Sequence, residues 1–149
     1  MNKVDTDRIK AFIKQGTAEV IDYHYCEAFD NYQCEAYPWL GFSDKIDWEA
    51  VKKPYKRFSW QEATVEETTT FLKTTCLGRF KEVCIVYGAK QPGLVLGFAD
   101  ACENLEQLVA FGWATRCIVG VERDKYGLIK LNHECFVEVD FVDWLTAPG

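Results

Sequence analysis

The strongest constraint on the fold of this chain comes from residues 116–144, where a turn precedes a long segment of alternating side chains. In residues 135–141, CFVEVDF, the odd positions are apolar, whereas Glu138 and Asp140 occupy even positions. Successive side chains of a strand point to opposite faces of its sheet. The pattern therefore predicts a last strand with one buried face and one acidic face.

Other segments add helices and further strands. Apolar spacing predicts helices at 6–15, 18–36, 64–75 and 105–111 and strands at 82–87, 94–98, 117–122 and 128–131. We therefore predict an α+β domain in which N-terminal helices pack on one face of a mostly antiparallel sheet of about five strands, with a C-terminal hairpin and a long last strand. With 149 residues, the chain has the length of one domain, so residues 1–149 are predicted to form a single globular unit.

The predicted helix at 18–36 has two chemically different sides. Ile21, Tyr25, Ala28 and Tyr32 recur at helical spacing, with Phe29 and Ala36 alongside, and this apolar stripe is expected to face the core. The other side carries acids and thiols: Glu19, Asp22, Cys26, Asp30 and Cys34. Like charges at this spacing destabilise a helix by a few tenths of a kcal/mol per pair when no base offsets them. An acidic helix face that carries such a cost is a candidate binding surface.

Cysteine usage favours a reduced protein. The seven cysteines are odd in number and form no CxxC pair: Cys26, Cys34, Cys76, Cys84, Cys102, Cys117 and Cys135. Most of them lie beside apolar residues in predicted helices or strands. We therefore expect them to behave as small buried hydrophobic side chains in a reducing compartment, without disulfides.

The termini and the charge limit where the protein acts and what it binds. The first ten residues contain no apolar segment of a signal peptide, and no apolar run approaches the ~18 residues of a membrane span. We expect a cytoplasmic protein. Its net charge of −6 argues against nucleic acid and anionic membranes as partners, because both are bound mainly by clustered Lys and Arg.

Acidic residues are concentrated in two blocks that contain no Lys or Arg. The first block, residues 17–44, holds six acids and the second, residues 131–149, holds four, so the rest of the chain has a net charge of +4. A local excess of this kind predicts a surface for a basic protein partner. The predicted partner-binding residues are the acids and the aromatic side chains beside the first block: Glu19, Asp22, Asp30, Glu35, Tyr37, Trp39, Phe42, Asp44, Glu134, Glu138, Asp140 and Asp143.

Metal-binding and nucleophilic sites are the alternatives to this hypothesis. Glu134, Glu138 and Asp140 are a candidate carboxylate cluster for a divalent metal, as in a hydrolase or nuclease. Two H-x-C pairs, at 24–26 and 133–135, contain the ligand types of a zinc site, although their spacing matches no common zinc motif. The sequence contains no G-x-S-x-G motif, and we expect a protein that is not an enzyme and needs no cofactor or metal.

The segment 52–60 interleaves four bases with aromatic residues, a pattern that is able to stack single-stranded nucleic acid. The segment is short and acids flank it. We favour a surface connection whose bases pair internally with the acidic helix.

A small, acidic, aromatic-rich α+β domain without a catalytic set resembles the immunity proteins of bacterial polymorphic-toxin and contact-dependent growth inhibition systems. The resemblance is one of type and carries no diagnostic motif. It implies a protein that binds one cognate toxin domain, commonly a basic nuclease, and blocks its active site or substrate surface. Phage-encoded inhibitors of host nucleases have the same character, so the sequence leaves both possibilities open.

Overall fold

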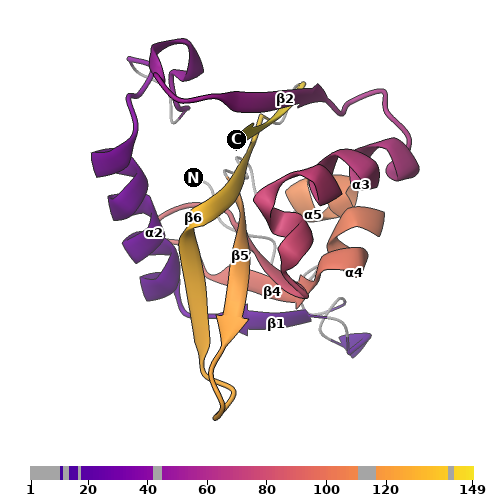
Figure 1. Ribbon diagram of the computed structural model, residues 1–149. Helices are drawn as coiled ribbons and strands as arrows, with labels where there is room; N and C mark the ends of the chain where they lie inside the picture. Colours follow the sequence, from indigo (N-terminus) through magenta and orange to yellow (C-terminus); the bar gives the residue numbers. More distant parts are fainter. Residues whose placement is uncertain (1–10, 12–13, 17, 42–44, 111–116, 141–142) are drawn as a thin grey trace.

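The computed structural model describes residues 11, 14–16, 18–41, 45–110, 117–140 and 143–149. Within these residues, helices combine with a seven-stranded antiparallel sheet, which confirms the α+β class (Figure 1). Most of the helix predicted at 6–15 lies outside the described residues. No described helix is long and apolar enough to cross a membrane.

The sheet has more strands than the five expected. Its order is β1-β4-β3-β5-β6-β7-β2, and every neighbouring pair is antiparallel. The strands are β1 (Ala18–Ile21), β2 (Tyr55–Ser59), β3 (Glu82–Val86), β4 (Gly93–Gly97), β5 (Cys117–Arg123), β6 (Ile129–Val139) and β7 (Trp144–Pro148). The two C-terminal strands predicted at 128–131 and 135–141 form the single strand β6, whereas β1, β2 and β7 were not predicted.

Helices cover both faces of the sheet. Helix α2 (Tyr23–Ala36) and the short 3-10 helix η1 (Trp48–Ala50) belong to one side, and α3 (Val65–Thr74), η2 (Cys76–Arg79), α4 (Phe98–Glu103) and α5 (Leu105–Ala110) belong to the other. Figure 1 shows α2 separated from α3, α4 and α5 by the strands. The central strands explain this arrangement, because β3 and β4 are buried at successive positions rather than at alternate ones. A strand of this kind needs cover on both faces.

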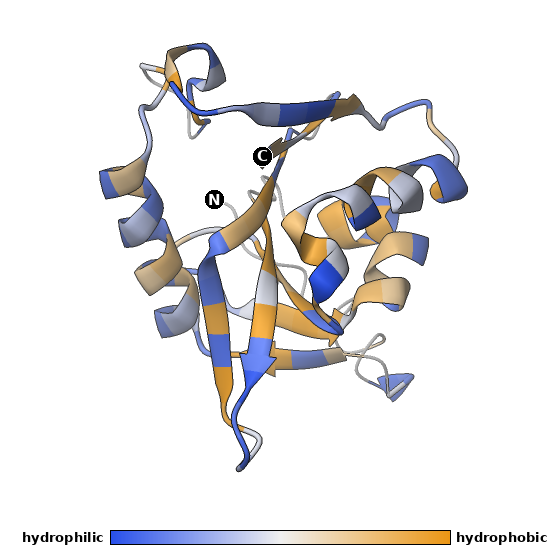
Figure 2. Ribbon diagram, in the orientation of Figure 1, coloured by the Kyte–Doolittle hydropathy of each residue, from blue (hydrophilic) through white to orange (hydrophobic). Residues whose placement is uncertain are grey.

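Two hydrophobic clusters therefore pack against the sheet, one on each face. In β3, Val83 and Ile85 pack with α3, α4 and α5, whereas Cys84 and Val86 pack with α2. Figure 2 shows the corresponding apolar colouring of the central strands and the mixed colouring of the helices. Each cluster is formed by residues that are distant in sequence, so both faces of the sheet are covered by long-range packing.

Helix α2 begins later and faces a different way than predicted. Residues 18–21 form strand β1, and the Asp22 carboxylate caps the helix by accepting the His24 N–H at 2.9 Å. Its buried residues are Cys26, Phe29 and Gln33. Of the predicted stripe, Ile21 and Phe29 are buried, whereas Tyr25, Ala28 and Ala36 are exposed, so the prediction is wrong for these three residues. Burying Cys26 and Phe29 leaves the polar end of Tyr25 in water.

The basic segment 52–60 contains β2, an edge strand that pairs with β7. Lys56 Nζ donates to the Thr74 carbonyl at 2.8 Å, and Arg57 Nε donates to Thr146 Oγ1 at 3.2 Å. Lys56 and Arg57 thus contact uncharged groups, and the prediction that they pair with the acidic helix is wrong.

One disulfide joins Cys76, the first residue of η2, to Cys135 in β6. The expectation that the chain contains no disulfide is therefore wrong. The two cysteines are 59 residues apart, and their Cα atoms lie 5.6 Å apart, within the usual range for a disulfide. Spacing along the chain gives no sign of this pairing, because it is the fold that brings η2 beside β6.

Candidate functional site

An irregularity in β6 shapes the most distinctive surface of the protein. In the β5–β6 ladder, Val119 pairs with Phe136, but the next residue, Gly120, pairs with Asn132. Residues 133–135 are therefore extra on β6 and form a bulge, which we call the β6 bulge. Bulges of this kind bend a strand and redirect its side chains. The disulfide at Cys135 attaches this bulge to η2.

The β6 bulge and α2 form the two sides of a hollow that we call the α2–β6 groove. Tyr25 and Ala28 line it from α2, and residues 129–134 line it from β6. The His133 ring lies 5.5 Å from the Tyr32 ring and 5.9 Å from the Phe29 ring, measured between centroids. Aromatic rings on both elements thus surround the start of the bulge.

Glu134 lies where this groove meets a second hollow. Glu134 also lines a cleft with Tyr32, Tyr37 and Cys76, together with residues 51, 53, 54, 148 and 149. The Glu134 side chain is exposed in the bulge, and its own N–H donates to Asn132 Oδ1 at 3.1 Å. One carboxylate is therefore placed among several aromatic rings on the surface.

The electrostatics of the groove reflect that carboxylate. Burial, and then the charge of Glu134, raise the pKa of the Tyr32 hydroxyl. Burial raises the pKa of the Tyr37 hydroxyl, and the nearby Tyr32 and Glu134 add to that effect. Burial, followed by the charge of Lys130, lowers the pKa of His133, so its neutral form is favoured. A carboxylate among neutral rings is suited to a cationic side chain, through ion pairing and cation–π contact.

Glu138 lies in a different environment from that predicted. It is only 7% exposed, and its Oε2 and Oε1 atoms each accept a hydrogen bond of 2.8 Å, from the Ile46 N–H and the Trp48 indole N–H. The residues around η1 cover the face of β6 that was expected to be acidic and solvated. Glu138 is an internal anchor, so its predicted place on the binding surface is wrong.

Three acids of the first block have local partners. Glu19 forms an ion pair with Arg123 at 3.1 Å, and Glu27 forms one with Lys90. The N–H of His24, and then its side chain, lower the pKa of Asp22, which is the capping residue of α2. Partners that are already close reduce the field these acids present to a second protein.

The remaining described acids of α2, Asp30 and Glu35, lie on opposite flanks of the helix. Residues spaced by three or four lie on the same flank of a helix, and the flank beside β6 carries Tyr25, Ala28, Tyr32 and Glu35. The opposite flank, beside Lys90, carries Tyr23, Glu27 and Asp30. The structure therefore brings Glu134 to the α2–β6 groove. Glu35 is exposed near the end of α2 and is not among the residues that line the groove, and helical spacing places the predicted residue Asp30 on the other side of α2.

The last two acids of the second block adjoin the end of β2. Asp143 Oδ1 accepts the Ser59 hydroxyl at 2.6 Å, and the Asp140 carbonyl accepts the Trp60 indole N–H at 3.0 Å. These contacts hold β2 against the C-terminal strands. Of the other predicted residues, Phe42 and Asp44 lie outside the described residues.

The predicted aromatic anchors Tyr37 and Trp39 are half-buried. The Tyr37 ring packs edge-on against Phe136, with centroids 5.4 Å apart, and lies 5.8 Å from Trp48. Trp39 Nε1 donates to the Gln33 carbonyl at 3.3 Å. Both residues therefore belong largely to the packing between α2 and the sheet, although Tyr37 also borders the cleft that contains Glu134.

The structure does not gather the predicted metal ligands. Glu134 is exposed on the β6 bulge while Glu138 is buried against Trp48, so these two carboxylates have separate surroundings. For the H-x-C pairs, Cys26 is buried and Cys135 is bonded to Cys76. Among the described residues, no group of three or more His, Cys, Asp or Glu is placed to hold a metal ion.

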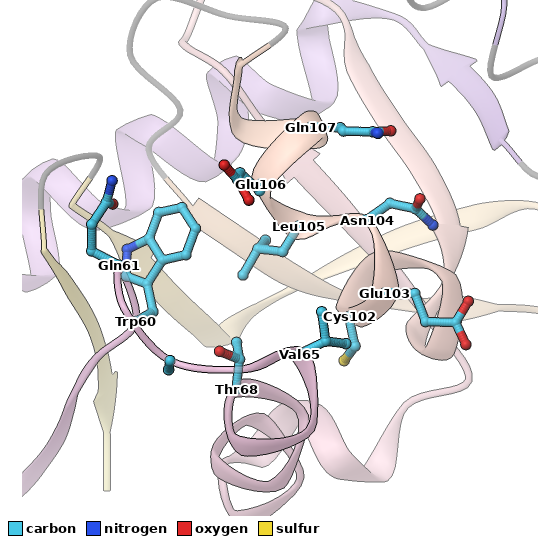
Figure 3. A pocket seen from close by; sticks show the side chains of 11 residues that line it. Trp60, Gln61, Val65, Thr68, Cys102, Glu103, Asn104, Leu105, Glu106 and Gln107 are labelled. Atoms are coloured by element: carbon cyan, nitrogen blue, oxygen red, sulfur yellow. The ribbon is translucent and has the colours of Figure 1, made fainter.

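A small cavity lies on the other side of the molecule, between the start of α3 and the junction of α4 with α5 (Figure 3). Figure 3 shows Leu105 directed toward Trp60, whereas the polar ends of Glu103 and Asn104 point away from it. Its volume is about 180 Å³, below the roughly 300 Å³ of typical ligand pockets. We therefore place the candidate site at the α2–β6 groove.

Sequence reasoning named Glu134 as a surface residue, but it placed Tyr25 and Tyr32 in the core and considered His133 only as a zinc ligand. Tyr25 and Tyr32 were assigned to the core because they recur at helical spacing. Cys26, Phe29 and Gln33 have the same spacing, and hydrophobicity alone does not decide between the two sets. Phe29 was predicted to lie alongside the stripe and is buried, and because its ring has no polar group to hydrate, it was the available signal for the face that is buried.

In comparisons with known proteins, no family model, curated protein or solved structure matched the chain.

Proposed function

We propose that this protein is a cytoplasmic binding protein that neutralises a cognate basic protein by occluding its active site or substrate surface. The observation that supports this proposal is the placement of Glu134 on the β6 bulge, among the rings that line the α2–β6 groove and the adjoining cleft. Tyrosine side chains supply large, rigid contact areas, and interface energy concentrates in such residues. A basic side chain of the partner would meet Glu134 between them.

The charges around the groove favour a basic partner. Glu122, Glu134 and Lys130 line the groove, so acids outnumber bases among its lining residues. This is a local acidic excess within a hollow that is partly shielded from water. Coulombic attraction is stronger there than on an open surface. The acids that already have local partners, such as Glu19 and Glu27, contribute less.

The class of partner that we propose is a nuclease-type toxin domain. Such a domain binds phosphates with clustered bases, so a carboxylate-bearing surface is able to compete with its substrate. This proposal agrees with the resemblance of type to immunity proteins. It assigns the chain a protein partner and no catalytic step.

The test is growth rescue followed by a binding measurement. If a neighbouring reading frame encodes a large secreted protein with a toxin-like C-terminal domain, expression of that domain in the cytoplasm should arrest growth, and co-expression of this chain should restore it. The purified pair should associate faster at low salt than at physiological salt, because charges separated by more than about 8–10 Å are screened there.

Matched charge reversals locate the surface. Glu134→Lys should weaken the complex by about 1–3 kcal/mol, because it places a base where the partner's base binds. Asp30→Lys makes the same charge change on the opposite flank of α2 and should mainly lower the association rate. If both reversals reduced the affinity equally, or if neither changed it, the α2–β6 groove would be excluded as the binding surface.

A further inference from the structure

The Cys76–Cys135 disulfide borders the cleft that contains Glu134. Cys76 is half-buried and lines this cleft, whereas Cys135 is 2% exposed and belongs to the core cluster beneath the sheet. The two residues joined by this bond therefore differ in exposure, and Cys76 is the one that lines the cleft.

The other thiols of the chain have a different environment. Cys26, Cys84, Cys102 and Cys117 are buried free thiols, and Cys34 is an exposed one. Burial raises the pKa of the Cys102 thiol, and the pKa of Cys84 is raised by its hydrogen bond with Cys26 and by burial. Thiols of this kind are unreactive. Cys102 lines the small cavity beside α3, but its raised thiol pKa disfavours the reactive thiolate, so exchange among the buried cysteines is favoured at the Cys76–Cys135 bond.

We propose that the Cys76–Cys135 disulfide is a site of thiol–disulfide exchange, attacked at Cys76 by a dithiol reductant that enters the cleft. The proposal rests on the cytoplasmic location proposed above, because disulfides of cytoplasmic proteins are usually transient or redox-sensing, in contrast to the permanent ones of secreted domains. It concerns the chemistry of this bond and does not depend on the identity of any binding partner.

The exchange has two steps. A thiolate of the dithiol forms a bond to Cys76 Sγ while the Cys76–Cys135 bond breaks, and Cys135 leaves as a thiolate that takes up a proton. The second thiol of the reductant then attacks the reductant's own sulfur in the mixed disulfide and releases Cys76 as a thiol. Two electrons pass from the dithiol, which ends as a disulfide, to the protein, which ends with two thiols.

Reduction would detach the β6 bulge from η2. Residues 133–135 have no partners in the β5 ladder, so the disulfide is a covalent attachment of a segment that lacks ladder hydrogen bonds. Release should increase amide hydrogen exchange in residues 132–136 and in η2. The exchange site would thereby control the position of Glu134.

The first experiment identifies the attacked sulfur. The Cys34→Ser variant removes the exposed free thiol, and the folded protein is treated with reduced glutathione, quenched with acid and mapped as peptides without further reduction. We expect a Cys76–Cys135 crosslink before treatment and glutathione on Cys76 after it. Absence of the crosslink, or glutathione on Cys135, would overturn the proposal.

The second experiment asks whether the bond opens in the folded state. Rates of reduction by dithiothreitol, and of alkylation of Cys84, are each divided by the corresponding rate in the unfolded protein. Folding should slow reduction of the disulfide at least about tenfold less than it slows alkylation of Cys84, because reduction requires only access to the cleft. Equal protection of the two sites would mean that the disulfide reacts only after global unfolding, and the proposal would fail.

Discussion

Strand β6 behaves differently before and after its bulge. Before it, residues 129–132 include exposed, half-buried and buried side chains, whereas every residue from Phe136 to Val139 is buried. Glu134 and Glu138 are four residues apart on this strand, yet Glu134 faces solvent and Glu138 accepts two internal hydrogen bonds. The position of an acid in a strand therefore does not reveal whether it serves the fold or the surface.

The difference arises from what covers each half. The second half of β6 pairs with both β5 and β7, and the rings of Tyr37 and Trp48 pack over its Phe136. The described pairing of the first half is with β5, and α2 stands beside it across the groove. Long-range cover, supplied by residues near position 46, thus decides the role of each carboxylate.

A large effect is expected from removing the disulfide that attaches the β6 bulge, at the junction of the two halves, to η2. The Cys76→Ala/Cys135→Ala double variant should lose about 4 kcal/mol of unfolding free energy, because the disulfide closes a loop with a sequence separation of 59 in the unfolded chain. Its thermal midpoint should fall by roughly 10 °C. Urea titration of this variant, and of the wild type with reductant, measures the loss. A Cys34→Ser control should match the wild type, and a double variant of unchanged stability would contradict the structure at this bond.

The next effect is at Glu138. Glu138→Ala should destabilise the protein by about 2–4 kcal/mol, because it leaves the N–H of Ile46 and the indole N–H of Trp48 buried without this acceptor. Glu134→Ala, the matched change on the exposed β6 bulge, should alter stability by less than about 0.5 kcal/mol. Chemical denaturation of the two variants measures the contrast, and similar losses would remove the distinction between the halves.

These contrasts show what the sequence allowed us to predict. The helix predicted at 64–75 is present as α3, and the strands predicted at 82–87 and 117–122 are present as β3 and β5, because local periodicity decides such elements. The α+β class follows from their order. Each of these elements carries its own signal within a short window.

The missed features all depend on distant partners. Strand β2, YKRFS, is short and basic and becomes a strand by pairing with residues 144–148 at the end of the chain. Strand β1 likewise depends on β4, and the cover over Glu138 comes from the segment near Ile46. A window along the sequence contains none of these partners, so the site was predicted only where an acid happened to stay exposed, as at Glu134.

A smaller effect is expected in the pH dependence of stability, through His133 in the β6 bulge. Burial lowers the pKa of His133 below its ordinary value of 6.5, so the unfolded chain binds a proton at this residue more readily than the folded protein does. Stability should therefore decrease as pH falls from 6.5 through the lowered folded pKa. Urea midpoints of the wild type and His133→Asn between about pH 7.5 and pH 5 measure this contribution.

The variant should have a flatter pH profile in that window. Glu82 provides an internal reference, because its hydrogen bond with Arg123 lowers its pKa below 4.5, and the stability it contributes is lost at more acidic pH. Identical profiles for wild type and His133→Asn between pH 5 and 7.5 would show that His133 is not buried in the way the structure describes.

The smallest expected change in stability is at Glu134, and it gives the most direct test of the comparison. Glu134→Lys reverses a charge on an exposed bulge, where substitutions usually change the unfolding free energy by less than about 0.5 kcal/mol. Glu138→Lys makes the same chemical change in the buried half and should prevent stable folding, because a buried charge without its hydrogen bonds costs several kcal/mol. Circular dichroism and urea titration of the two variants therefore measure how far apart the two environments are. If Glu134→Lys proved as disruptive as its counterpart, Glu134 would be a structural residue, and the α2–β6 groove would lose the exposed carboxylate on which its proposed role depends.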